Sequence, residues 1–121
     1  MLLSACSAEE PKTCLGDFCL PNDAELIGHQ QPADFDLYQV DWQGARFGIY
    51  VGDFPDFRIG SGVKRAVTID ADAELKIDDT QGQILAQLGA RSPRYLHIIG
   101  PCIAIESCAL AKFADAIQKA Q

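Results

Sequence analysis

The chain has 121 residues, a hydrophobic fraction of 48% and a formal net charge of −7, from 17 acidic and 10 basic residues. This length fits one domain with a single core, and no run approaches the ~18–20 consecutive apolar residues of a membrane-spanning helix. An acidic chain repels phosphate backbones and favours a cationic partner, so we expect no nucleic-acid binding.

The N-terminal segment Leu3-Ser4-Ala5-Cys6 has an aliphatic residue and two small residues before a cysteine. This pattern resembles the lipobox of bacterial lipoproteins, which implies cleavage before Cys6 and acylation of Cys6, with palmitate among the lipids. Residues 1–5 would be the remnant of a signal peptide, whose charged and apolar parts would lie upstream of the printed sequence. In this family Ser7, directly after the anchor, is compatible with sorting to the outer membrane. The resemblance thus implies a periplasm-facing protein that a lipid anchor holds to the outer membrane.

Removing Cys6 from the five cysteines leaves Cys14, Cys19, Cys102 and Cys108. An even number in a small acidic domain predicts two disulfides in an oxidising compartment. We favour the local pairs Cys14–Cys19 and Cys102–Cys108, because Gly16-Asp17 can form a turn and Pro101 restricts the approach to Cys102. The crossed pairing, which would tie the two ends of the chain together, stays open.

Residues 6–34 are rich in Pro, Asp, Asn and Gln and lack periodicity. We expect a lipid-anchored tether and a disulfide loop there, with a single globular domain over residues 35–121. From Asp36 to Val51, polar and apolar residues alternate around a turn at Gln43-Gly44. This register pairs Tyr38 with Ile49, Val40 with Phe47 and Trp42 with Ala45 on one face, and Leu37 with Tyr50, Gln39 with Gly48 and Asp41 with Arg46 on the other.

Further along the chain, the alternation of residues 63–69 predicts a strand, whereas residues 73–77 fit either a short strand or a helical turn. Thr80 and Gln83 form a capping box, and apolar residues follow at helical spacing, so we predict a helix over residues 81–88.

Residues 94–100 predict a strand in the sheet interior. Residues 107–120 predict an amphipathic helix with Leu110, Phe113, Ala114 and Ile117 on one stripe. These elements favour an α+β fold, in which an antiparallel sheet of about four strands has two helices packed on one face.

The loop Asp53-Phe54-Pro55-Asp56-Phe57, together with Tyr50, is the leading candidate for a protein-binding site. Apolar anchors inside an acidic rim are typical of such interfaces. Phe54 and Phe57 could instead fold back and close the end of the core. Full burial of both rings would exclude the interface.

The other chemistry-bearing residues favour structural roles. The acidic segment Asp70–Asp79 departs from an EF-hand at Leu75 and Gln81, so we interpret it as a solvated acidic edge. His97 lies in an apolar strand run, which favours a hydrogen-bonded core or sheet-face histidine over a catalytic base. His29 is expected to be exposed. The cysteine spacings and the isolated histidines do not match a zinc site, and we expect no metal or cofactor.

No set of residues forms a catalytic constellation, so we expect a non-enzymatic, protein-binding lipoprotein. An inhibitor-like or immunity-like protein that blocks a cationic envelope enzyme is compatible with the charge, the disulfides and the tether. Two alternatives are a structural or assembly accessory of the outer membrane and a small hydrolase whose site is assembled from residues such as His97 and the Asp70–Asp79 segment.

Overall fold

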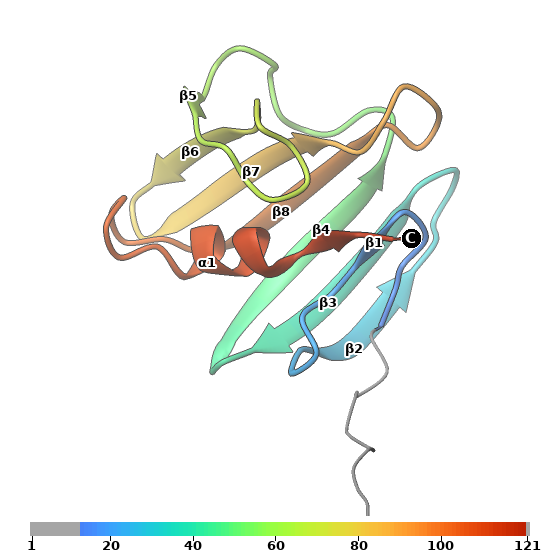
Figure 1. Cartoon of the computed structure of the whole chain (residues 1–121), viewed down its shortest axis with the longest axis horizontal. Helices are drawn as coiled ribbons and strands as arrows, with labels where there is room; N and C mark the ends of the chain where they lie inside the picture. The colour runs from blue at the N-terminus through green and yellow to red at the C-terminus, as the bar shows by residue number, and fades with distance from the viewer. Residues whose placement is uncertain (1–12, 121) are drawn as a thin grey trace, which may run out of the picture.

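The computed structural model describes residues 13–120, so the predictions for the lipobox and Cys6 lie outside the described residues. A seven-stranded antiparallel sheet in the order β2-β3-β4-β8-β7-β6-β5 dominates the fold (Figure 1). Its strands are β2 (Glu25–Gln30), β3 (Asp36–Trp42), β4 (Ala45–Gly52), β5 (Val63–Lys64), β6 (Glu74–Asp78), β7 (Gln81–Gln87) and β8 (Tyr95–Pro101). A two-stranded sheet pairs β1 (Phe18–Cys19) with β9 (Gln118–Lys119), and the helix α1 spans Ala109–Ala116.

The predicted α+β fold, with about four strands and two helices, is wrong, because the regular secondary structure of residues 13–120 is mostly strand, with one short helix. The decisive error is the helix predicted over residues 81–88, because residues 81–87 form the strand β7. Ile84 and Ala86 are buried on one face of the sheet and Leu85 on the other. Since β7 has buried side chains on both faces of the sheet, it shows no alternation, and its apolar run resembles helical spacing.

The hairpin predicted over residues 36–51 is confirmed in every pair of its register. Gln43 and Gly44 have φ values of 51° and 81°, the combination that a two-residue hairpin turn requires. On the face opposite the core, Arg46 Nε donates to Asp41 Oδ1 at 2.8 Å. The turn and the alternation are local properties, which is why the sequence predicts them correctly.

The remaining predicted strands have mixed outcomes. The strand predicted over residues 94–100 is confirmed as β8 (Tyr95–Pro101), which lies between β4 and β7 in the sheet interior. The strand predicted over 63–69 is reduced to β5, and residues 74–78 form a strand rather than a helical turn. β2 pairs with β3, so the sheet begins at Glu25.

The core lies between the large sheet and the layer formed by α1 and the β1–β9 pair (Figure 1). The helix predicted over residues 107–120 is shorter than expected, because it ends at Ala116 and Gln118–Lys119 form β9. Its apolar stripe is confirmed, since Leu110, Phe113, Ala114 and Ile117 are all buried. Phe113 of α1 stacks on Phe47 of β4, with ring centroids 4.2 Å apart. Phe18 of β1 belongs to the same buried cluster. No helix among residues 13–120 is long and apolar enough to cross a membrane.

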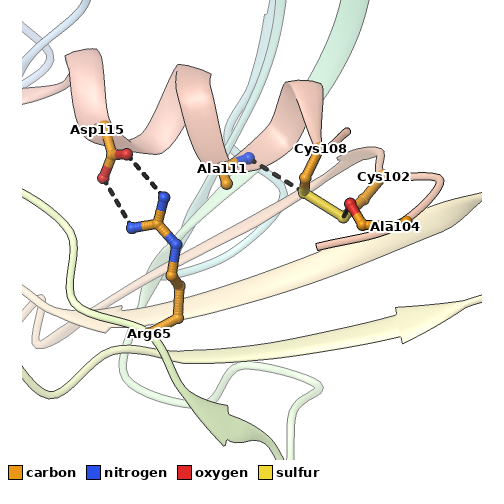
Figure 2. The surroundings of a disulfide bond; sticks show 6 residues. All are labelled: Arg65, Cys102, Ala104, Cys108, Ala111 and Asp115. Carbon is orange, nitrogen blue, oxygen red and sulfur yellow. Dashed lines mark hydrogen bonds and ion pairs between the residues drawn. A yellow bond between two sulfur atoms is a disulfide. The ribbon is translucent and has the colours of Figure 1, made fainter. Parts of the chain in front are cut away.

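The cysteines form the favoured local pairs, Cys14–Cys19 and Cys102–Cys108. Figure 2 shows that the second disulfide lies at the start of α1, where Ala111 N–H donates to Cys108 Sγ at 3.4 Å. The disulfide therefore closes a loop and also caps the helix. Further along α1, Asp115 pairs with the Arg65 guanidinium at 2.8 Å, which holds the segment after β5 against the helix.

Candidate functional site

The candidate site lies on the face of the large sheet that α1 does not cover. By strand alternation, this open face carries two side-chain rows, formed by Gln39, Gly48, Ile99 and Gln83 and by Leu37, Tyr50, His97 and Leu85. Gly48 contributes no side chain, and a Cβ there would meet no atom within 4 Å. Two adjoining hollows of about 420 Å³ and 520 Å³ lie on this face and share Leu37, Tyr50, His97 and Ile99.

The loop after β4 places its two phenylalanines differently. Phe57 is buried, with 7% of its surface exposed, and its ring meets the ring of His97 edge-on at a centroid distance of 5.6 Å. Lys76 Nζ lies 4.4 Å from the centroid of the same ring. Phe54 is 82% exposed. The core interpretation therefore holds for Phe57, whereas Phe54 remains available to a partner.

Backbone hydrogen bonds hold this loop in place. The Glu74 carboxylate accepts N–H groups from Gly60 at 2.9 Å and from Gly62 at 3.0 Å. These hydrogen bonds lower the pKa of Glu74. Burial of the carboxylate acts in the opposite direction, and the nearby charges of Lys64 and Lys76 lower the pKa further. Phe54 N–H donates to Tyr50 Oη at 2.9 Å, so the exposed ring is carried by an ordered backbone.

Aromatic rings and carboxylates line the larger hollow. Phe35 and Tyr50 lie with their ring centroids 5.2 Å apart, and Phe54 lines the same hollow. Asp34, Asp53 and Asp56 are the acidic residues of its lining. Rings present a negative face to a cation, and nearby carboxylates add a full charge, so this lining attracts a positively charged group.

The three carboxylates differ in their partners. Asp53 accepts the Ser92 hydroxyl at 2.7 Å and Arg94 N–H at 3.0 Å, and the first of these bonds contributes most to the lowered pKa of Asp53. Among residues 13–120, neither Asp34 nor Asp56 forms a hydrogen bond or an ion pair. Asp53 thus orders the loop, and Asp34 and Asp56 are the carboxylates left for a partner.

His97 forms the buried floor of the site, with 4% of its surface exposed. Its Nε2 lies 2.8 Å from Gln83 Oε1, a hydrogen bond in which the ring N–H donates to the amide oxygen. Burial lowers the pKa of His97, Lys76 lowers it further, and Asp56 opposes the shift. The sequence predicted a hydrogen-bonded core or sheet-face histidine, and these contacts are those of a buried sheet-face histidine.

The acidic segment 70–79 has structural contacts of its own. Asp70 accepts N–H groups from Asp72 at 2.9 Å and Gln87 at 2.8 Å. Glu74 is 7% exposed, so the interpretation as a solvated edge does not extend to it. Within the chain from 13 to 120, no three His, Cys, Asp or Glu side chains are grouped so that they could hold a metal ion. His29 is exposed as expected, and its Nε2 lies 2.8 Å from Asp36 Oδ1.

Sequence reasoning did not assign Asp34 and Phe35 to the site. It placed Asp34 at the end of the tether and Phe35 at the first position of the domain. Extending the predicted hairpin register by one pair sets Phe35 opposite Gly52. A Cβ at Gly52 would lie 2.8 Å from Phe35 Cβ and 2.6 Å from Tyr50 Oη, so the missing side chain makes room for both rings. Gly52 was the sequence feature that could have indicated that Phe35 lies beside Tyr50.

No protein-family model, curated protein or solved structure matches this chain, so the site is interpreted from its own geometry.

Proposed function

We propose that this chain is a non-catalytic, protein-binding lipoprotein of the bacterial envelope, whose open-face hollow receives a cationic side chain of its partner. The exposed ring of Phe54 beside the unpaired carboxylates of Asp34 and Asp56 carries the proposal. An exposed aromatic side chain on a hydrogen-bonded loop is a rigid anchor of the kind that dominates interface energetics.

Arginine or lysine fits this lining best. The aliphatic stem would pack on Leu37 and Ile99, which is 41% exposed, while the charged head lies among the rings and carboxylates. A cation over an aromatic ring contributes about 0.5–2 kcal/mol, depending on how far it is desolvated. The net charge of −7 would speed the encounter with a basic partner.

The proposed location rests on the lipobox-like segment that ends at Cys6 and on the cysteine usage. Two disulfides, Cys14–Cys19 and Cys102–Cys108, suit an oxidising compartment such as the periplasm. An acidic domain tethered there is suited to an inhibitor-like or immunity-like role against a basic envelope enzyme.

Crosslinking in intact envelopes, with the lipidated protein as bait, tests the binding proposal. Wild type is expected to capture a basic protein, and Phe54→Ala and Asp56→Asn are expected to lose most of it. Ile27→Ala is the matched control, because Ile27 is 38% exposed on the edge strand β2 and does not line the hollow that contains Phe54 and Asp56. Capture should weaken as salt rises, since exposed charges are screened. Equal capture by wild type and Phe54→Ala contradicts the proposal.

The anchor is tested separately by metabolic labelling with a fatty acid. The protein expressed from its own gene in its bacterial host should incorporate label, and Cys6→Ser should not. Equal labelling of both proteins excludes the anchor.

A further inference from the structure

A third hollow, of about 630 Å³, lies along the outer edge of β6. We call it the β6-edge hollow. Its apolar lining consists of Val63, Leu75, Ile77 and Ile105, and its charged lining of Lys64, Arg65, Lys76 and Asp78. It shares Gln83 with the acidic hollow beside Phe54, and the charged residues that line the two hollows are different.

Only half of the outer edge of β6 is covered. β5 pairs Val63 with Leu75 and Lys64 with Glu74. Continuing this register past Val63 would set Gly62 opposite Lys76 and then Ser61 opposite Ile77. Ser61 N–H donates instead to the Arg58 carbonyl at 3.1 Å. Among residues 13–120, no strand lies against the outer side of Ile77.

The backbone groups of Ile77 face this gap. Arg65 N–H donates to the Ala73 carbonyl at 2.8 Å, so Ala73 directs its carbonyl to the outer side. Alternate residues of an antiparallel strand direct their N–H and C=O groups to the same side, and Ile77 shares the parity of Ala73. Ile77 therefore offers a donor and an acceptor to an incoming strand.

The gap is a consequence of the loop that precedes β5. Glu74 accepts N–H groups from Gly60 and Gly62, which draws residues 60–62 away from the line of β5. The strand pairing therefore stops at Val63 because a buried carboxylate holds the preceding chain elsewhere.

An apolar surface flanks the free edge. Val63 is 66% exposed, Ile77 37% and Ile105 68%. Ile105 lies in the loop closed by the Cys102–Cys108 disulfide, where Ser107 N–H donates to the Ala104 carbonyl at 3.0 Å. This side chain is thus held exposed by a covalent loop, an arrangement that presents it to a partner.

The charge of the hollow is opposite to that of the chain. Three of the 10 basic residues line it, whereas Asp78 is the one acidic residue of its lining. Arg65 is paired with Asp115, so Lys64 and Lys76 are the cations nearest the free edge. An incoming segment with carboxylates would be attracted there.

We infer that the outer edge of β6 accepts an extended acidic segment of a partner protein as an added strand. Side chains of paired residues point to the same side of a sheet. A residue opposite Ile77 would therefore be apolar and pack on Ile77 and Ile105, and a residue opposite Lys76 would be acidic. Main-chain hydrogen bonds would supply affinity and the side chains specificity.

The probe is a synthetic peptide of about eight residues in which valine and glutamate alternate. Its binding to the oxidised protein is followed by amide chemical shifts. We expect saturable shifts in residues 75–78 and a Kd below about 1 mM. A fully N-methylated peptide keeps its side chains and loses its donors, and a valine–lysine peptide reverses its charge. Each is expected to bind at least about tenfold more weakly.

Lys76→Gln should weaken binding of the valine–glutamate peptide about fivefold, and Lys112→Gln, on α1, should leave it unchanged. Phe54→Ala should also bind it normally, which separates this result from the proposed function. Three outcomes overturn the inference: no shifts in residues 75–78, equal binding of the N-methylated peptide, and a peptide-free dimer whose interface covers the same amides.

Discussion

The ring of Phe47 lies directly against the backbone of Gly100. A Cβ at Gly100 would come within 2.3 Å of Phe47 Cδ1. Phe47 is fully buried and stacks in turn on Phe113 of α1. The Phe47 ring therefore lies between β8 and α1 and contacts both. It can do so because Gly100 of β8 has no side chain.

Gly100→Ala should lower the free energy of unfolding by about 1–3 kcal/mol, because the added methyl group overpacks the core. Denaturant unfolding measures the change. The matched control is Gly89→Ala, where a Cβ meets no atom within 4 Å. That substitution should be neutral, or stabilising by up to about 1 kcal/mol through the unfolded chain. Equal losses at the two positions would contradict the role of the Phe47 contact.

The cap function of the second disulfide can be separated from its loop closure. The double variant Cys102→Ala/Cys108→Ala removes both and should cost about 2–4 kcal/mol of stability. In Cys102→Ala/Cys108→Ser the hydroxyl can accept the Ala111 N–H in place of the sulfur. The serine variant should therefore be about 1 kcal/mol more stable than the alanine variant in thermal or denaturant unfolding. Identical stabilities would show that the sulfur does not cap α1.

Replacing Phe57 by alanine should lower stability much more than replacing Phe54. Phe57→Ala removes a buried ring that contacts His97 and Lys76, and we expect a loss of about 3 kcal/mol. Phe54→Ala alters an exposed ring and should change stability by less than about 0.5 kcal/mol. A large loss in Phe54→Ala would show that this ring packs on the protein, and would remove it from the proposed interface.

Glu74 should make stability depend on pH. The backbone N–H groups of Gly60 and Gly62 donate to the Glu74 carboxylate, and these bonds lower its pKa below the ordinary value of 4.5, with the Gly60 bond contributing most. The carboxylate therefore stabilises the fold fully above about pH 4.5, and this contribution is lost as the pH falls through the lowered pKa. Glu74→Gln should cost about 1.5–3 kcal/mol at neutral pH.

The difference between wild type and Glu74→Gln should shrink when unfolding is repeated at about pH 3. Glu106→Gln, at an exposed position in the disulfide loop, serves as the control and should behave like wild type at both pH values. A difference that stays constant between the two pH values would mean that the Glu74 charge does not hold the loop.

The features that the sequence predicts correctly are local ones. The register of β3 and β4 follows from alternation and from the turn at Gln43-Gly44, and the buried stripe of α1 follows from helical spacing. Both cysteine pairs close short loops, with separations of 5 and 6 residues. In each case neighbouring residues contain the information that sets the structure.

The candidate site is predicted only in part. Tyr50 and the loop after β4 stand out as aromatic and acidic residues, but the closeness of Tyr50 to His97 comes from the β4–β8 pairing, which joins segments far apart in the chain. The same is true of Phe35, which enters the site because Gly52 leaves room for it.

By itself, the sequence determined the β3–β4 hairpin, the buried stripe of the C-terminal helix and the charge that favours a basic partner. Only the tertiary structure decided that residues 81–87 are a strand, because burial on both faces removes the alternation that identifies a half-buried strand. Only the tertiary structure separated Phe57 from Phe54, since the two rings share one loop and differ in what lies beneath them. Phe57 covers His97 and is buried, and Phe54 stays in solvent.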